Sequence, residues 1–214
     1  MWSGAEFVTN AVMKGAGTNG GQMQPVAHSS SLPERYHAVR FYESDRSLAQ
    51  IVAEFLKEGF EGGSPGLIVA TPVQRGAIIR ELTDRSLDVT ELQRSDDLVL
   101  LDAKETLSTF MIDGRPDAGK FKYQMCQAIE KVCRGRANCT VRIFGSMVDV
   151  LWQEGERDAA VRLEVLWNQL AQTQAFSLLC GYAIGNFYKD ASFGDICAQH
   201  SHVVSADGTA KAVA

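Results

Sequence analysis

The segment Leu98–Asp102 (LVLLD) could take part in nucleotide chemistry, because an apolar strand that ends in aspartate holds magnesium in P-loop ATPases. Such a site also needs a glycine-rich loop ending in Gly-Lys-Ser/Thr, whose backbone N–H groups bind the phosphates. The only Gly-Lys pair, Gly119-Lys120, is followed by phenylalanine and preceded by no strand. We therefore expect no P-loop ATPase activity. Asp102 is instead predicted to cap a helix over Ala103–Phe110.

Metal binding is the second chemistry that the residue types allow. Cys197, His200 and His202 place three potential ligands within six residues, and cysteine with histidine is a common ligand set for zinc. A closed site needs a fourth ligand, and no matching spacing is visible elsewhere in the chain. We therefore predict no metal site and no cofactor.

Nucleophilic catalysis has little support from the sequence. Ser146 follows a strand-like segment, but Phe144-Gly145-Ser146-Met147 is not the Gly-x-Ser-x-Gly turn of serine hydrolases. We expect the Ser146 hydroxyl to cap the next helix by accepting a backbone N–H bond. Cys180 lies inside an apolar run, where a small buried side chain fits better than a reactive thiolate. We predict no catalytic residues, so the chain is not expected to be an enzyme.

Aromatic and polar residues gather at the ends of the predicted strands, which suits a mostly apolar pocket with a few orienting polar groups. Aromatic side chains at such spacings also pack in hydrophobic cores, and we expect that role for Trp167. The residues that we predict to bind a small ligand are Phe41, Tyr42, Glu43, Asp102, Ser146, Asp149, Trp152 and Tyr182. In this pocket the aromatic rings would supply contact area, and Glu43, Ser146 and Asp149 would orient the ligand.

A surface for a partner protein is predicted on the long helix Arg157–Gln174. Glu164, Asn168 and Gln172 are the polar residues that this helix could present. The same residues are also typical of a helix face that contacts only solvent. Both interpretations place the three side chains at the surface.

The elements that must position these residues alternate between strand and helix patterns. This alternation predicts an α/β three-layer sandwich with a mainly parallel central sheet, in which ligands bind at the carboxyl ends of the strands. The predicted strands are His37–Tyr42, Gly66–Thr71, Leu98–Asp102, Thr140–Phe144 and Phe176–Tyr182. The predicted helices are Ser47–Phe60, Val73–Arg85, Ala103–Phe110, Lys120–Arg134, Met147–Trp152 and Arg157–Gln174.

Composition excludes several classes of protein. The chain has 214 residues and a formal net charge of −5, with no cluster of basic residues that would bind nucleic acid or anionic lipid directly. The longest apolar run, Phe176–Ile184, is too short to cross a membrane. The N-terminus does not resemble a secretion signal. Five cysteines without framework spacing predict buried free thiols and a cytoplasmic protein.

The chain is predicted to hold one folded domain between two tails. Residues 1–33 are rich in glycine, serine and proline and lack apolar periodicity, which is typical of a disordered segment. Residues 204–214 are small and polar, and we expect a flexible tail there. The folded body is therefore expected to cover residues 34–203.

Seven segments of this body, in the same order, resemble the MEDS (methanogen/methylotroph DcmR sensory) domain family over residues 35–203. The resemblance implies a degenerate relative of the RecA/KaiC-like P-loop fold, in which Phe41–Leu56 takes the place of the phosphate loop and its helix. It also implies a sensor of small, often hydrocarbon-like molecules. The segments are His37–Tyr42, Leu67–Pro72, Leu101–Ala103, Phe110–Asp117, Phe144–Trp152, Arg162–Asn168 and Leu178–Tyr182.

The chain departs from the pattern of this family in one motif. Gly145-Ser146-Met147 stands where the family usually has Gly-Glu-Met, so a negative charge is missing at the start of a helix, where the helix dipole would favour it. No kinase, receiver or DNA-binding pattern follows residue 203. We therefore expect a stand-alone sensor that acts through a histidine kinase or transcription regulator, with a second copy of the chain as a further candidate partner. The alternatives are a non-catalytic interaction adaptor and a degenerate nucleotide-binding protein.

Overall fold

The computed structural model describes residues 35–187, 193–205 and 208–213. The expected N-terminal tail lies outside the described residues. Within them, no helix is both long and apolar enough to cross a membrane.

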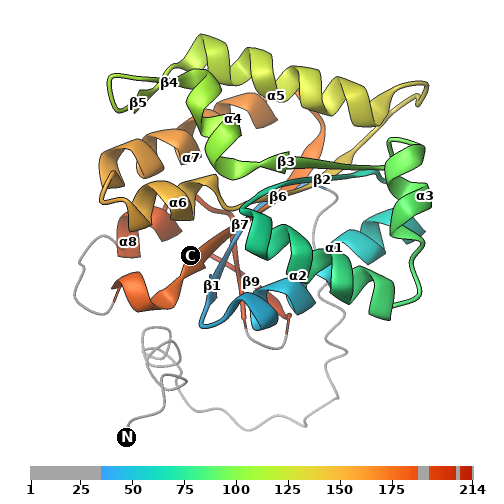
Figure 1. Cartoon of the computed structure of the whole chain (residues 1–214). Coiled ribbons are helices and arrows are strands. Elements are labelled where there is room, and N and C mark those ends of the chain that lie inside the picture. Colours follow the sequence, from blue (N-terminus) through green and yellow to red (C-terminus); the bar gives the residue numbers. More distant parts are fainter. Residues whose placement is uncertain (1–34, 188–192, 206–207, 214) are drawn as a thin grey trace, which may run out of the picture.

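A seven-stranded sheet forms the centre of the fold (Figure 1). Its strand order is β3-β2-β6-β7-β1-β8-β9, and all neighbouring strands are parallel except β8 and β9. The predicted mainly parallel sheet is thus confirmed. The strands are β1 (His37–Tyr42), β2 (Gly66–Ala70), β3 (Leu98–Asp102), β6 (Val141–Gly145), β7 (Phe176–Ala183), β8 (His202–Val204) and β9 (Ala210–Ala212).

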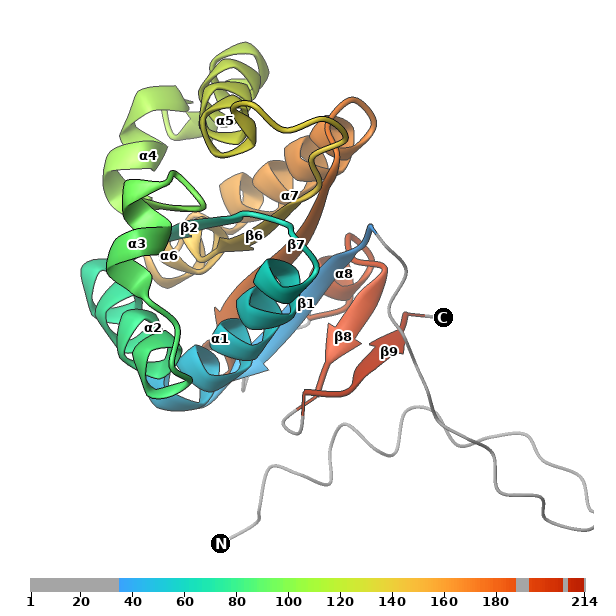
Figure 2. The same cartoon turned by 90° about the vertical axis from the view of Figure 1, so that its right-hand side faces the viewer.

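Helices cover both faces of this sheet, as the predicted three-layer sandwich requires (Figures 1 and 2). One face carries α1 (Asp45–Glu61), α2 (Pro72–Asp84) and α3 (Val89–Arg94). The other carries α4 (Ala103–Phe110), α5 (Ala118–Cys133), α6 (Met147–Gln153) and α7 (Arg157–Ala171). The smaller elements are the hairpin β4 (Met111–Ile112) and β5 (Arg115–Pro116), the 3-10 helix η1 (Ile184–Phe187), and α8 (Phe193–Cys197).

The hydrophobic core is divided by the sheet into two clusters. Successive side chains of a strand point to opposite faces, so along β7 Cys180 and Tyr182 face α7 while Leu179 faces α1. In β1, Val39 lies on the α7 face and Tyr42 on the α1 face. Adjacent residues of one strand therefore pack in two different hydrophobic clusters.

Short polar side chains set where the helices begin. Asp102 accepts hydrogen bonds from the backbone N–H groups of Lys104 and Glu105 at 2.9 and 3.1 Å, which confirms the predicted cap of α4. Thr71 and Gln74 form a reciprocal capping box at the start of α2. Because these caps follow directly after β3 and β2, they fix how each helix leaves the carboxyl edge of the sheet.

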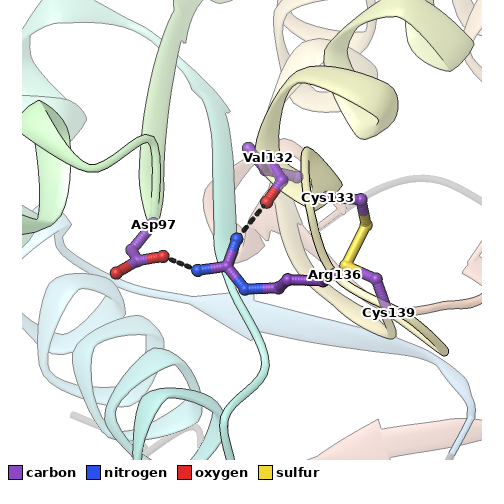
Figure 3. Close-up of a disulfide and its surroundings, with 5 residues drawn as sticks. All are labelled: Asp97, Val132, Cys133, Arg136 and Cys139. Atoms are coloured by element: carbon purple, nitrogen blue, oxygen red, sulfur yellow. Dashed lines mark hydrogen bonds and ion pairs between the residues drawn. A yellow bond between two sulfur atoms is a disulfide. The ribbon is translucent and has the colours of Figure 1, made fainter.

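Two predictions about the ends and the cysteines are wrong. The segment expected to be a flexible C-terminal tail contributes β9, which pairs with β8 through Val204 and Ala210. Cys133 and Cys139 form a disulfide (Figure 3), although all five cysteines were expected to be free thiols. The two cysteines are 6 positions apart in sequence, so the bond closes a local turn that no long-range spacing pattern would show. The three free cysteines are Cys126, Cys180 and Cys197.

The turn closed by this disulfide is also tied to β3. Arg136, which lies between the two cysteines in sequence, donates a hydrogen bond to the carbonyl oxygen of Val132 at 2.6 Å and forms an ion pair with Asp97 (Figure 3). Asp97 directly precedes β3. The disulfide thus closes the turn that follows α5. Arg136 within this turn ties it to the start of β3, an edge strand of the sheet.

Candidate functional site

A chain of hydrogen bonds joins four buried side chains at the carboxyl edge of the sheet. The Ser146 hydroxyl donates to Gln74 Oε1 at 2.6 Å, and Gln74 Nε2 donates to the Tyr42 hydroxyl at 3.0 Å. The Tyr42 hydroxyl in turn donates to Asp149 Oδ2 at 2.7 Å. The chain links the end of β1 to the first turns of α2 and α6. We call these four residues the edge network.

Asp149 receives donors on both of its carboxylate oxygens. Oδ2 accepts from Tyr42 and from Gln153 Nε2 at 2.7 Å, and Oδ1 accepts from the backbone N–H of Ala183 at 3.0 Å. Asp149 is 1% exposed. Burial raises the pKa of its carboxyl group, and the three hydrogen bonds oppose this rise. A carboxylate is thus held in the interior by neutral donors.

The edge network also perturbs the phenol of Tyr42. Burial is the main cause that raises its pKa, and the neighbouring carboxylate of Asp149 raises it further. The phenol therefore stays protonated at neutral pH and acts as a hydrogen-bond donor. This protonation state matches a positioning role for Tyr42.

The predicted cap by Ser146 is wrong. Its hydroxyl makes no capping hydrogen bond to α6 and is directed across to Gln74 instead. Gln74 was not among the predicted site residues. The sequence did carry a signal for it, because Thr71-Pro72-Val73-Gln74 has the spacing of a capping box. That signal predicts the orientation of the Gln74 side chain at the start of α2, although it does not predict its second partner.

The other predicted aromatic residues lie together on the α7 face. The Tyr182 ring packs edge-on against Trp152 at 6.0 Å between centroids and lies 6.1 Å from Phe41. Its hydroxyl donates to Glu164 Oε1 at 2.8 Å. The backbone connects this aromatic group to the edge network, because Ala183 directly follows Tyr182 and donates to Asp149.

Two of the predicted ligand-binding residues stand apart from these groups. Asp102 ends β3, and β2, β6 and β7 separate that strand from β1. Its carboxylate caps α4 and forms an ion pair with Arg75 at 3.0 Å. Glu43 is exposed just before the start of α1. The structure therefore groups Tyr42, Ser146 and Asp149, places the three aromatic rings beside them, and leaves Asp102 and Glu43 outside.

The side chains of both groups are packed and largely paired with one another. Tyr42, Ser146, Asp149, Trp152 and Tyr182 are all at most 5% exposed. A groove found elsewhere lies between β3 and α5 and is lined by Leu98, Leu100, Gln127 and Lys131 among others. None of the predicted ligand-binding residues lines that groove. A ligand at the carboxyl edge would therefore have to displace existing contacts.

The predicted partner surface on α7 is only partly a surface. Gln172 is exposed at the end of the helix. Asn168 is half-buried, where its Oδ1 atom accepts from His37 and its Nδ2 atom donates to the carbonyl of Gln199. Glu164 is fully buried, so its prediction as a partner-binding residue is wrong. Glu164 faces β7, where its carboxylate accepts from the Tyr182 hydroxyl, and His200 from the segment after β7 lies 3.4 Å from the same carboxylate.

Cys197, His200 and His202, whose spacing was considered and set aside as a metal site, are not grouped together in the structure. Of these three, only His200 belongs to the group of potential metal ligands found among the described residues. Cys197 is half-buried, and His202 Nδ1 pairs with the hydroxyl of Ser201 at 2.9 Å. Potential metal ligands that are close in sequence are therefore not close in space in this region.

The comparisons with known proteins agree with this architecture. A KaiC-like protein from the hyperthermophilic archaeon Pyrococcus horikoshii OT3 has a similar structure, with a TM-score of 0.54 and 16% sequence identity over 80% of this chain and 70% of that one. This likeness supports the RecA/KaiC-like fold. No curated protein sequence matches the chain.

The family comparison identifies the family of the chain, whereas the structural comparison supports only its fold. Residues 36–201 match the model of the "MEthanogen/methylotroph, DcmR Sensory domain". The matched range includes the strands β1, β2, β3, β6 and β7 and the helices on both faces of the sheet. The chain is therefore a member of the MEDS family of sensory domains.

Proposed function

We propose that this MEDS domain binds a small, largely apolar molecule with one hydrogen-bonding group at the carboxyl edge of its sheet, and that it signals without catalysis. The observation that carries the proposal is the buried hydrogen bond between Tyr42 and Asp149. It joins β1 to α6 at the edge where open α/β sheets bind ligands.

The edge network offers a way to convert binding into movement. A ligand group that replaces the Tyr42–Asp149 bond must separate the end of β1 from α6. A hydrogen bond to a charged group contributes roughly 1.5–3 kcal/mol, which is enough to shift a two-state equilibrium about tenfold or more. Because α6 packs on α7, a displacement of α6 would reach the outer surface of the domain.

The surroundings of the network favour a small apolar ligand. Phe41, Trp152 and Tyr182 lie on the other side of β1 and β7 from Tyr42 and form a continuous aromatic layer. Aromatic surface beside a few fixed polar groups is the usual lining of small-molecule sites. The absence of a Gly-Lys-Ser/Thr loop from the sequence argues against nucleotide triphosphate as this ligand.

The hydrogen bonding of the site supports a role without catalysis, because both oxygens of Asp149 are already occupied. Burial raises the pKa of both Tyr42 and Asp149. A phenol with a raised pKa is a poor acid, and Asp149 is already occupied by three donors. We therefore propose that the domain passes its signal to a separate histidine kinase or transcription regulator, or to a second copy of itself.

A thermal-shift screen tests this proposal. The full chain is mixed with short-chain alcohols, ketones and amides, each of which carries one hydrogen-bonding group, since a ligand that prefers the folded state raises its melting temperature. We expect at least one stabilising compound, whose effect is lost in Asp149→Asn and kept in the matched control Asp102→Asn. If no compound stabilises the wild-type chain, or if both variants respond equally, the proposed site is wrong.

A co-purification experiment distinguishes the sensor hypothesis from the adaptor hypothesis. An adaptor would bind a histidine kinase or another copy of the chain with an affinity that no small molecule alters. A sensor would bind its partner with an affinity that changes when the stabilising compound is present. A nucleotide-binding protein would instead show heat of binding with ATP and magnesium that Asp102→Ala weakens.

A further inference from the structure

Four buried side chains with metal-binding atoms converge between β1, β7 and α7. His37 begins β1, Cys180 lies within β7, Glu164 lies within α7, and His200 precedes β8. One ligand atom of each lies within 4.8 Å of the others. All four are at most 7% exposed. This cluster is separate from the edge network, and neither the family assignment nor the proposed function uses it.

The distances between the ligand atoms suit a tetrahedral metal centre. His37 Nε2 lies 3.1 Å from Glu164 Oε2 and 3.3 Å from Cys180 Sγ, and Cys180 Sγ lies 3.4 Å from Glu164 Oε2. His200 Nε2 lies 3.4 Å from Glu164 Oε1. Zinc bonds of about 2.0–2.3 Å in a tetrahedron separate the ligand atoms by roughly 3.3–3.6 Å. His37, Glu164 and Cys180 thus lie at metal-binding distances as they stand, and His200, which contacts the other carboxylate oxygen, completes the group within 4.8 Å.

The outer hydrogen bonds hold both imidazoles with Nε2 directed inward. His200 Nδ1 lies 2.7 Å from the carbonyl oxygen of Ile196, which can only accept, so this nitrogen carries the proton. His37 Nδ1 lies 2.9 Å from Asn168 Oδ1. Because Asn168 Nδ2 donates to the carbonyl of Gln199, the orientation of its amide is fixed and His37 Nδ1 must also donate. Such partners orient the histidine ligands of metal sites.

This arrangement leaves an imbalance at the centre of the cluster. In neutral imidazoles both Nε2 atoms carry lone pairs, and both face the carboxylate of Glu164. His200 Nε2 is buried and lies 3.4 Å from Glu164 Oε1, an oxygen that already accepts from the Tyr182 hydroxyl at 2.8 Å. The centroids of the two imidazole rings lie 4.2 Å apart, so both rings present Nε2 to the same carboxylate.

We propose that His37, Glu164, Cys180 and His200 bind one zinc ion. When the ion binds, the S–H bond of Cys180 breaks, its proton passes to solvent and a zinc–sulfur bond forms. The carboxylate and the thiolate together neutralise the two charges of the ion, and the two imidazoles bind through their free lone pairs. Two nitrogens, one sulfur and one oxygen are ligands that zinc accepts. Four protein ligands leave no open position, which is typical of a structural site.

Metal content and cobalt spectroscopy test this site on the full chain, expressed without a histidine tag. We expect one zinc per chain by elemental analysis. After removal of zinc with a chelator, we expect cobalt to restore one equivalent of metal with the intense near-ultraviolet absorption of a cobalt–thiolate bond. Cys180→Ser should abolish that absorption, and His200→Ala should lower the affinity for cobalt at least tenfold. The matched controls Cys197→Ser and His202→Ala should bind metal like the wild type.

Several outcomes would overturn the metal site. A wild-type chain that holds no metal and takes up no cobalt excludes it, whatever the variants do. If cobalt binds without the absorption of a cobalt–thiolate bond, Cys180 is not a ligand and the metal lies elsewhere. If Cys197→Ser loses that absorption, the thiolate ligand is Cys197 and the proposed site is wrong. Circular dichroism shows whether each variant is folded, and the wild-type cobalt spectrum keeps the test valid if one is not. None of these measurements needs a signalling ligand, so failure here is distinct from failure of the proposed sensor function.

Discussion

Replacing Tyr42 with phenylalanine removes one hydroxyl from the centre of the edge network and leaves the ring in place. The hydroxyl donates to Asp149 and accepts from Gln74, so the substitution breaks two buried hydrogen bonds. The bond to the carboxylate accounts for roughly 1.5–3 kcal/mol, and the Gln74 amide left without an acceptor adds about 1 kcal/mol or more. No cavity larger than an oxygen atom forms. We expect the free energy of unfolding to fall by about 3 kcal/mol.

Urea unfolding followed by circular dichroism measures this loss. The midpoint should move to lower urea with an unchanged slope, which shows that stability changed and the denatured state did not. For a domain of this size the melting temperature should fall by roughly 6–12 °C. Tyr123→Phe is the matched control, because Tyr123 is 67% exposed and the same hydroxyl is removed from solvent. A loss below about 1 kcal/mol in Tyr42→Phe, or an equal loss in the control, would refute the reasoning.

The pH dependence of the same variant provides an independent check. Burial raises the pKa of Asp149 above its ordinary value, and the hydrogen bond from Tyr42 lowers it. A carboxyl whose folded pKa is raised adds stability that is present at low pH and is lost as pH rises through that pKa. Tyr42→Phe removes a lowering influence, so the difference from wild type should be larger at about pH 7.5 than at about pH 5. An unchanged difference would show that Asp149 does not titrate as the structure implies.

Three further predictions concern other parts of the fold. Gly66→Ala should destabilise the protein by about 1–2 kcal/mol, because the new Cβ would lie 3.1 Å from side-chain atoms of Leu56 and Phe60; equal melting temperatures would contradict this. Trp167→Ala should cost about 3–5 kcal/mol in urea unfolding, since Trp167 is 1% exposed and packs against Phe121 at 5.0 Å; a loss below about 1 kcal/mol would show that the core refills the space. Replacing Cys133 and Cys139 together by serine should cost about 2 kcal/mol for so short a loop, and dithiothreitol should then have no further effect; a variant that stays sensitive to the reductant would contradict the pairing.

Local sequence patterns predicted the parallel strands and the helices that cover them well. Leu98–Asp102 and the cap at its end were predicted with the bounds that the structure shows, because an apolar run followed by aspartate encodes both features locally. The strands β8 and β9 were missed, since segments of three residues are too short to show a periodicity. β8 pairs with β1, which lies more than 150 residues earlier in sequence, and β9 pairs with β8.

The candidate site was predicted less well, because its hydrogen bonds join distant segments. Tyr42 was chosen from its position at a strand end and Asp149 from the short helix that follows another strand, but their bond spans 107 positions and leaves no trace in spacing. Glu164 shows the limit most clearly. On the helix it lies on the buried face, four residues after Ala160 and three before Trp167, where Tyr182 of β7 donates to its carboxylate. The position belongs to the apolar stripe of the helix, but a charged residue was expected to lie at the surface, and the groups that contact it come from β7 and from the segment around His200.

The position of β1 in the sheet has a consequence for how the chain folds. Both neighbours of β1 come from far along the sequence, since β7 pairs through Leu178–Ala183 and β8 through His202 and Val203. During synthesis, the first strand must therefore wait until about 140 more residues have left the ribosome before it gains a hydrogen-bonded neighbour. The strands β2, β3 and β6 pair among themselves and can assemble earlier. The first of the described strands thus joins the sheet only when β7 is made, before β8 and β9 are added, and its exposed edges need protection throughout that interval.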